Sequence, residues 1–405
     1  MMRLGYFFKK IMKARSSGTL WDKSRRFLVT MVRRPFEVFT GYICLRKADR
    51  NLNITDGFAD HRQEKNHHRS NREHLRRIIV AYKASKQAQG QAALPFEIQG
   101  LWAEWISVNY KTLLTILEAE DIEGLSNLLE NLFRDKCTIG TGGYDNYIRY
   151  RSPLGSLYIK YVWNKYRDKL LSLDFDLQRI DFPHVGNQTG ILLDGKVISI
   201  ETLRHAYHAV EMCELLRDVP KAIIVEIGGG LGGQSYQTMN LSKQVSKYLV
   251  FDIPEVAVIS SYFLLSAFPN RRVRLFGEGS VSIDSCEEYD VAVFPHFAIT
   301  QLPNSSVDLF YNSCSFSEMD GLSSTEYLSI IERASRRYFM HDNHDTAFEF
   351  RNPDGSTSLN VIGSMLIPNP ALFKRIYKKP RVHGLPEDRS FVHFEYLYEK
   401  LQFSN

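Results

Sequence analysis

A short apolar run followed by a glycine-rich turn constrains this chain more than any other segment. Residues 222–233 read AIIVEIGGGLGG, and their first half, rich in β-branched residues, predicts a buried central strand of a parallel sheet. The glycines after it let the backbone pass close to a bound molecule where a Cβ atom would collide. Because the carboxyl end of a strand and the N-terminus of a helix meet at such a turn, the segment predicts a site for a nucleotide-like cofactor.

The second half of the chain is expected to alternate between strands and helices. A hairpin is expected at residues 191–198, because the turn pair Asp194-Gly195 separates two apolar runs. Further strands are expected at residues 222–227, 248–252, 272–276, 290–294, 307–311, 338–340 and 391–398, the last as a closing or edge strand. Helices are expected at residues 201–217, 233–241 and 254–268, and from a capping box at Ser323 and Glu326. Such alternation predicts an α/β fold with a doubly wound sheet.

Three regions of the chain differ in composition and pattern. Residues 1–70 read as a basic arm and a polar linker, residues 71–184 are expected to form a mostly helical domain, and residues 185–405 contain the α/β pattern. In the helical region we interpret Trp102 and Trp105 as core rather than as a ligand cage, because apolar residues recur there at helical spacing. The glycine run at residues 140–143 has no strand before it and is interpreted as a loop.

The N-terminal arm carries most of the positive charge of the chain. Residues 1–90 contain 21 Lys and Arg residues against 7 Asp and Glu residues, although the net charge of the whole chain is only +5. Basic residues interleaved with aromatic ones, as in Tyr6 to Lys10, predict peripheral contact with an anionic membrane surface. A solvated extension is the alternative. Nucleic acid is disfavoured, because no nucleic-acid-binding motif accompanies the charge.

Several classes of protein are disfavoured by the sequence. The most apolar segment, residues 248–268, contains Asp252, Pro254 and Glu255, which argues against a membrane span. The basic N-terminus lacks the apolar core and cleavage site of a secretory signal. Five cysteines without C-x-x-C spacing argue against both a disulfide framework and a structural zinc site. We therefore expect a cytoplasmic protein without a bound metal.

The glycine turn is compatible with two classes of cofactor. Gly228, Gly230 and Gly233 fit the G-x-G-x-x-G fingerprint of dinucleotide sites, and Asp252 follows 19 residues after the last of them. An NAD-dependent oxidoreductase is therefore an alternative. Glu226 favours S-adenosylmethionine instead, because a carboxylate at the strand end attracts the cationic amino-acid end of this cofactor and repels a pyrophosphate. Asp252 suits either cofactor, since both carry a ribose diol.

Several motifs together resemble one protein family. They are residues 185–187 before the hairpin, residues 225–233, residues 251–255, residues 311–313 with 316–319, and the block from His341 to Asp345. These motifs are similar to those of sugar O-methyltransferases, a family of class I S-adenosylmethionine-dependent methyltransferases. The resemblance extends from about Trp102 to Tyr398. It implies a Rossmann-like methyltransferase sheet behind a helical N-terminal domain, S-adenosylmethionine as cofactor, and a sugar or glycan acceptor in surface-polysaccharide biosynthesis.

The donor site is expected around the glycine turn. The residues expected to hold S-adenosylmethionine are Glu226, Gly228, Gly229, Gly230, Asp252 and Ile253. By analogy with the fold, Asn312 and Ser313 are expected to line its methionine side, with turn formation as the alternative role of this polar pair. Asn187 and Glu318 are candidates for contacts with the acceptor.

A general base is expected in the block from His341 to Asp345. Methyl transfer to a hydroxyl needs positioning of the reactants and removal of the hydroxyl proton, and histidine suits proton transfer near neutral pH. His344 is preferred over His341 because we expect it further out on a loop, with Asp342 or Asp345 orienting it. Magnesium is disfavoured because it prefers carboxylates and water to imidazole. A solvated polar loop is the alternative interpretation.

Three rival functions stay open on the sequence. The first is a methyltransferase whose acceptor is a small natural product or a lipid. The second is the NAD-dependent oxidoreductase, and the third is a non-enzymatic cofactor-binding scaffold that its basic arm docks on a glycan-assembly complex.

Overall fold

The computed structural model describes residues 52–64, 68–281, 283, 289–352, 355–382 and 393–402. The basic segment of residues 1–50, for which we predict contact with an anionic membrane surface, lies outside these residues. Among the described helices, none is long and apolar enough to cross a membrane.

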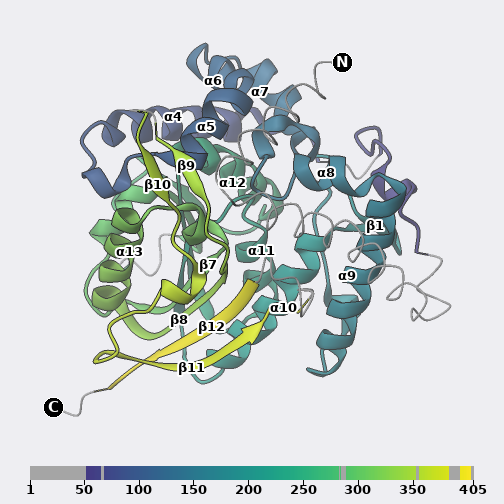
Figure 1. Ribbon diagram of the computed structural model, residues 1–405. Helices are drawn as coiled ribbons and strands as arrows, with labels where there is room; N and C mark the ends of the chain where they lie inside the picture. Colours follow the sequence, from purple (N-terminus) through teal and green to yellow (C-terminus); the bar gives the residue numbers. More distant parts are fainter. Residues whose placement is uncertain are drawn as a thin grey trace, which may run out of the picture.

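An eight-stranded sheet forms the centre of the molecule (Figure 1). Its order is β11-β12-β8-β7-β3-β4-β6-β5. The strands are β3 Ala222–Ile227, β4 Val245–Asp252, β5 Val273–Leu275, β6 Val291–Pro295, β7 Val307–Ser313, β8 Ser335–His344, β11 Phe373–Pro380 and β12 His393–Lys400. Neighbours from β5 to β8 are parallel, whereas β12 runs antiparallel to β8 and β11. The expected doubly wound α/β fold is thereby confirmed.

The sheet has its topological switch point at β3. This strand pairs with β4 on one side and with β7 on the other. The chain builds the β4 side first and then crosses β3 to build the β7 side. Ligands of open parallel sheets bind beside the carboxyl ends of the strands at such a point. The glycine turn that follows β3 lies there.

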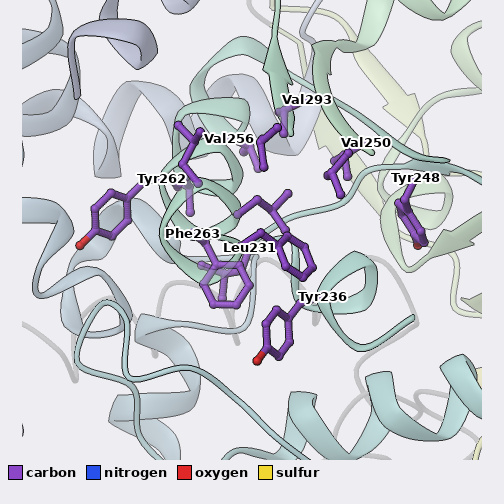
Figure 2. Packing of buried hydrophobic residues seen from close by; sticks show 14 of the residues in the cluster. Leu231, Tyr236, Tyr248, Val250, Val256, Tyr262, Phe263 and Val293 are labelled. Atoms are coloured by element: carbon purple, nitrogen blue, oxygen red, sulfur yellow. The ribbon is translucent and has the colours of Figure 1, made fainter. Parts of the chain in front are cut away.

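Helices cover both faces of the sheet. Helices α10 Ile200–Leu215, α11 Gly233–Leu241, α12 Pro254–Ala267 and α4 Arg72–Gln89 pack on one face, and α13 Gly321–Ala334 packs on the other (Figure 1). Alternate residues of β3 point to the two faces, so that Ile224 and Val225 belong to different hydrophobic clusters. Figure 2 shows part of the cluster that contains Ile224, whose members include Leu231, Val250 and Phe263.

The region before the sheet is helical, as expected. It contains α5 Gly100–Asn109, α6 Lys111–Glu118, α7 Ile122–Leu129, α8 Tyr144–Tyr150 and α9 Pro153–Leu171. The apolar stripe that begins at Trp102 is divided between α5 and α6 at Tyr110. Leu113 of α6 and Leu125 of α7 share a hydrophobic cluster with Ile224 of the sheet. The helical region therefore packs on the sheet, and its boundaries at residues 70 and 184 stay a prediction.

Small elements complete the description. The expected hairpin is confirmed as β1 Ile191–Leu193 and β2 Lys196–Ile198, and a second hairpin forms from β9 Glu349–Arg351 and β10 Thr357–Leu359. Short 3-10 helices are η1 Asp56–Phe58, η2 Leu94–Phe96, η3 Leu132–Arg134, η4 Lys136–Thr138, η5 Leu177–Arg179, η6 His296–Gln301, η7 Ser315–Glu318 and η8 Gly363–Met365.

Three predictions of elements were wrong in detail. The block from His341 is not a loop, because β8 continues to His344 and pairs with β12 along this whole stretch. The segment predicted as a closing or edge strand, now β12, lies inside the sheet, and the unpredicted β11 forms the edge. Helix α13 begins before the proposed capping box, because the Asp320 carboxylate accepts the backbone N–H of Ser323 at 2.8 Å.

Candidate functional site

A cavity with an empty volume of about 890 Å3, part of it open to solvent, lies at the carboxyl ends of β3, β4, β6 and β7. Its sheet side includes the predicted residues Gly228, Gly230, Asp252, Ile253 and Ser313. Its other walls come from the segment around η2 and α5, the loop before α8, and the segment from η7 into α13. The cavity therefore joins the switch point of the sheet to the helical region.

The glycine turn approaches the cavity with a backbone that favours glycine. Gly228 has a φ of +74° and Gly230 a φ of +55°, both in the left-handed region. A Cβ atom on Gly228 would lie 2.3 Å from the Ser315 Oγ atom, so a side chain there would push η7 away. Two predicted donor-site residues thus form a wall that a larger residue would disrupt.

Asp252 links the glycine turn to the end of β4. Its Oδ2 accepts the Gly230 N–H at 2.8 Å and its Oδ1 accepts the Ile253 N–H at 2.8 Å. Burial raises the pKa of Asp252 to about 7, although these two hydrogen bonds favour the ionised form. The carboxyl group therefore lies at the cavity wall, and a bound cation or the hydroxyl groups of a ligand can change its protonation state.

Glu226 lies behind the glycine turn rather than on the cavity wall. Its side chain is buried, and a Cβ atom on Gly229 would come 3.5 Å from its Oε2. Within the described part of the chain, Glu226 has no ion pair and its Oε2 has no hydrogen-bond partner. Burial raises its pKa to about 8, opposed by the Tyr248 hydroxyl and the charge of Arg204. Neither Glu226 nor Gly229 lines the cavity.

The cavity wall is acidic. Its carboxyl groups belong to Glu97, Asp252, Glu318 and Asp320, and no Lys or Arg occurs among the described residues that line it. Unlike charges attract more strongly where protein replaces water, so this wall favours a cationic ligand over a pyrophosphate. Behind the wall, Arg204 of α10 donates a hydrogen bond to Ser313, and Arg381 donates one to the Cys314 Sγ.

Trp102 and Glu318 form a hydrogen-bonded pair in the cavity wall. The Trp102 Nε1–H donates to the Glu318 Oε2 at 2.8 Å. Burial raises the pKa of Glu318 to about 8. Trp102 packs against the core cluster, as interpreted from the sequence, but it also lines the cavity, as do Gly140 and Thr141 of the loop before α8. The helical periodicity around Trp102 could not distinguish a residue facing the core from one facing a cavity.

Asn312 and Ser313 have different positions at the end of β7. Asn312 is fully buried: its Nδ2 donates to the Ile227 carbonyl at 2.8 Å, and its Oδ1 accepts from the Asn343 Nδ2 at 2.8 Å. It ties β3, β7 and β8 together and does not line the cavity. Ser313 does, and so does Cys314, which the sequence did not single out and whose φ is +69°.

The three predicted catalytic residues lie on β8 and do not line the cavity. His341 is fully buried and stacks on Tyr396 with ring centroids 4.5 Å apart, and burial lowers its pKa to about 3. His344 is also buried, which lowers its pKa to about 4. The argument for His344 assumed an exposed loop, and the pairing of β8 with β12 removes that assumption.

Asp342 is surrounded by cationic groups. The Arg381 Nε donates to its Oδ1 at 3.0 Å and to its Oδ2 at 2.8 Å, and an Arg204 nitrogen lies 3.9 Å from its Oδ2. Although burial alone would raise its pKa, the charge of Arg381 and the neighbouring rings of His393 and His208 hold the pKa of Asp342 well below its usual range. The carboxylate is therefore an ionised structural partner of Arg381 rather than the orienting group of a predicted histidine base.

Asn187, a predicted acceptor contact, joins three segments outside the cavity. Its Nδ2 donates to Asp60 at 3.0 Å and to Asn131 at 2.8 Å, and its Oδ1 accepts the backbone N–H of His61 at 3.0 Å. Its φ of +57° fits an asparagine in a turn. Its hydrogen-bonding capacity is used within the protein. Across the residues that the structure describes, no three His, Cys, Asp or Glu side chains group to hold a metal.

Comparison with known proteins gives no family assignment. No family model matches the chain, and no curated protein matches it. Among solved structures, the Burkholderia thailandensis 1,6-didemethyltoxoflavin-N1-methyltransferase, crystallised with S-adenosylhomocysteine, is 13% identical, with a TM-score of 0.31, over 49% of this chain and 79% of that chain. The N-terminal domain of EvdMO1, crystallised with SAH and D-fucose, is 10% identical, with a TM-score of 0.33, over 49% and 83%. The [4+2]-cyclase SpnF is 11% identical, with a TM-score of 0.35, over 51% and 84%. Values this low assign no function, so the functional argument rests on the site.

Proposed function

We propose that this protein is an S-adenosylmethionine-dependent O-methyltransferase that acts on a sugar hydroxyl in glycan biosynthesis. The observation that carries the proposal is an acidic cavity at the switch point of the sheet, walled by a glycine turn and by Asp252. A sulfonium cofactor with an ammonium group fits a wall of carboxyl groups, whereas a dinucleotide pyrophosphate would meet Asp252 without a neutralising Lys or Arg on the described wall.

The residues present fit this cofactor in three respects. Asp252, at the end of the strand next to the glycine turn, suits a ribose diol. Glu226, buried behind the glycine turn with an Oε2 that lacks a hydrogen-bond partner, adds negative charge for the ammonium end when it is ionised. The apolar side chains of Ile253 and Val256, which also line the cavity, suit the adenine ring of the cofactor. When bound, S-adenosylmethionine supplies a methyl group already activated for transfer.

The acceptor is proposed to enter from the helical side. This side of the cavity combines the indole of Trp102 with the carboxyl group of Glu97 and the amide of Gln99, and the carboxyl group of Asp320 reaches the cavity from the start of α13. Side chains rich in hydrogen-bond acceptors suit a ligand with several hydroxyl groups, and an aromatic ring adds apolar surface. The same acidic wall disfavours an anionic acceptor group inside the cavity. The motif resemblance to sugar O-methyltransferases supports the sugar as the acceptor over a lipid.

Ligand binding separates the proposed function from the oxidoreductase. Isothermal titration of the purified chain with S-adenosylmethionine, S-adenosylhomocysteine and NAD should give binding of the first two and none of NAD. A ligand present at 100 times its Kd should also stabilise the fold by about 2.7 kcal/mol in thermal unfolding. Binding of NAD with no binding of S-adenosylhomocysteine would overturn the proposal.

We further propose that the basic arm contacts an anionic membrane surface from the cytoplasmic side, where the glycan is assembled. The charge of residues 1–90 supports this proposal. Sedimentation with phosphatidylserine-containing vesicles should retain the full chain and release a chain that begins after residue 50. Equal sedimentation of both chains would contradict it.

A further inference from the structure

We propose that Glu318 is the general base that accepts the proton of the acceptor hydroxyl, and that Trp102 is the positioning residue that aims its carboxylate. This inference rests on the proposed methyltransferase function and replaces the histidines of β8 as the base. The hydroxyl oxygen forms its bond to the methyl carbon while the carbon–sulfur bond breaks and leaves its electron pair on sulfur. The hydroxyl proton passes to the Glu318 carboxylate.

The position of η7 brings Glu318 to the glycine turn. Side chains three residues apart lie one above the other on a 3-10 helix, so Ser315 and Glu318 share one face of η7. Ser315 lies against the glycine turn, since a Cβ atom on Gly228 would collide with its Oγ. Glu318 is therefore held on the face of η7 that borders the donor site, and both side chains line the cavity.

The segment that carries Glu318 is held firmly. Phe316 is fully buried, and the backbone N–H of Ser317 donates to the Asn343 Oδ1 at 3.0 Å. The carboxylate itself is fixed at one oxygen by the 2.8 Å hydrogen bond from Trp102. A catalytic group held by its neighbours in this way keeps the geometry that proton transfer requires.

The charges around Glu318 favour a base that works near neutral to weakly alkaline pH. Burial raises its pKa to about 8, the charges of Cys314, Asp252 and Asp145 add to this rise, and the hydrogen bond from Trp102 opposes it. The other titratable side chains on the described cavity wall are Glu97, His296, Asp320 and Tyr327. A base is most effective when its pKa lies close to the working pH.

Other titratable groups of the wall are less suited to the role. Asp320 caps α13, and its carboxylate accepts the Ser323 N–H. The Cys314 Sγ lies 3.1 Å from an Arg381 nitrogen, so a thiolate there is paired with a guanidinium. His296 has its Nε2 hydrogen-bonded to the Phe96 carbonyl at 2.7 Å, and burial lowers its pKa to about 4.

The test compares Glu318→Gln with the unaltered chain, using a panel of p-nitrophenyl glycosides of hexoses and 6-deoxyhexoses as acceptors. S-adenosylhomocysteine formation should fall about 10²–10⁴-fold in the variant, because glutamine keeps the hydrogen bond from Trp102 but cannot accept a proton. S-adenosylhomocysteine, which lacks the sulfonium charge, should still bind to the variant. In the unaltered chain the kcat/KM for the glycoside should rise with pH through the pKa of Glu318, and this rise should vanish in Glu318→Gln.

Trp102→Phe gives a second, independent readout. Losing the indole N–H removes a group that favours ionised Glu318, so the rise in kcat/KM should move to higher pH, with Trp105→Phe as the matched control. Difference infrared spectra against Glu318→Gln should show the protonated carboxyl band of Glu318 persisting to higher pH in Trp102→Phe, without any turnover.

The outcomes distinguish this inference from the proposed function. If S-adenosylhomocysteine does not bind, or if it binds and no glycoside is methylated, the proposed function fails and the inference with it. If glycosides are methylated and Glu318→Gln keeps the rate and pH profile of the unaltered chain, the inference alone is overturned. A rise with pH that disappears in Cys314→Ser but persists in Glu318→Gln would assign the proton to the thiolate instead.

Discussion

Two groups of acidic side chains lie at the carboxyl edge of the same sheet and differ in their partners. Asp342 on β8 is held by Arg381, with Arg204 3.9 Å away and a His393 ring nitrogen 3.8 Å away. Asp252 and Glu318 lie on the cavity wall, and neither forms an ion pair with a Lys or Arg of the described chain. The Asp342 carboxylate thus has cationic partners within the protein, whereas the carboxyl groups of Asp252 and Glu318 do not.

The pKa values of the two groups follow this difference. Paired cations hold the pKa of Asp342 well below its usual range despite its burial. Burial without such partners raises the pKa of Asp252 to about 7, and those of Glu226 and Glu318 to about 8. Burial of a carboxyl group is thus no guide to function by itself. A missing counter-charge beside a cavity indicates where a cationic ligand binds.

The largest expected effect is the loss of stability when the Asp342 carboxylate is removed from its cationic partners. Asp342→Ala leaves Arg381 buried without its carboxylate and should lower the free energy of unfolding by about 3–5 kcal/mol. Urea unfolding followed by circular dichroism measures this loss, with Glu104→Gln on the exposed surface of α5 as the control. A loss no greater than that of the control would show that the Asp342 cluster does not stabilise the fold.

A smaller effect is expected when Asp252, which has no ion pair, is replaced. This effect concerns the affinity for the cofactor rather than the stability of the fold. Asp252→Asn should weaken binding of S-adenosylhomocysteine about 10–100-fold, because it removes a charged acceptor for a ribose diol. The asparagine Oδ1 can still accept one of the two backbone N–H groups, so the loss of stability should be well below that of Asp342→Ala. Calorimetric titration measures the affinity. Unchanged affinity would remove Asp252 from the donor site.

A third effect concerns the pH dependence of stability. Glu226 has a pKa of about 8 in the fold against an ordinary value of 4.5, so the folded state binds more protons than the unfolded state between these values. The free energy of unfolding should therefore fall as the pH rises from about 5 to about 8. Glu226→Gln should reduce this fall by an amount on the order of 1–3 kcal/mol. Urea unfolding at both pH values tests it, and identical slopes for the two proteins would contradict it.

The sheet could be predicted from local patterns because each central strand is a short, continuous apolar run. Residues 222–227 were expected as a strand and form β3 with the same bounds. The hairpin at 191–198 was identified from its turn residues in the same way. The end of β8 could not be predicted, because His341 to His344 are polar and are held in a strand by pairing with β12, about fifty residues later in the chain, and in part with β7.

The sequence placed those cavity residues that directly follow a predicted strand. The glycine turn and Asp252 follow directly from strand ends, so the sequence places them at the cavity. Trp102 and Thr141 reach the same cavity from the helical region, and no local pattern reports that long-range packing. The histidines were favoured by their chemistry alone, since a sequence does not show burial. Glu318 was singled out, but its role depends on the Trp102 hydrogen bond, which the sequence could not show.

The most direct test of the central claim is proton release on cofactor binding. If the carboxyl groups of Asp252, Glu226 and Glu318 lack counter-charges until the cationic cofactor binds, binding must favour their ionised forms. Calorimetric titration with S-adenosylmethionine at pH 7, in two buffers of different ionisation enthalpy, should therefore show a net release of protons. Binding without proton release, or binding of NAD in place of S-adenosylmethionine, would contradict the account.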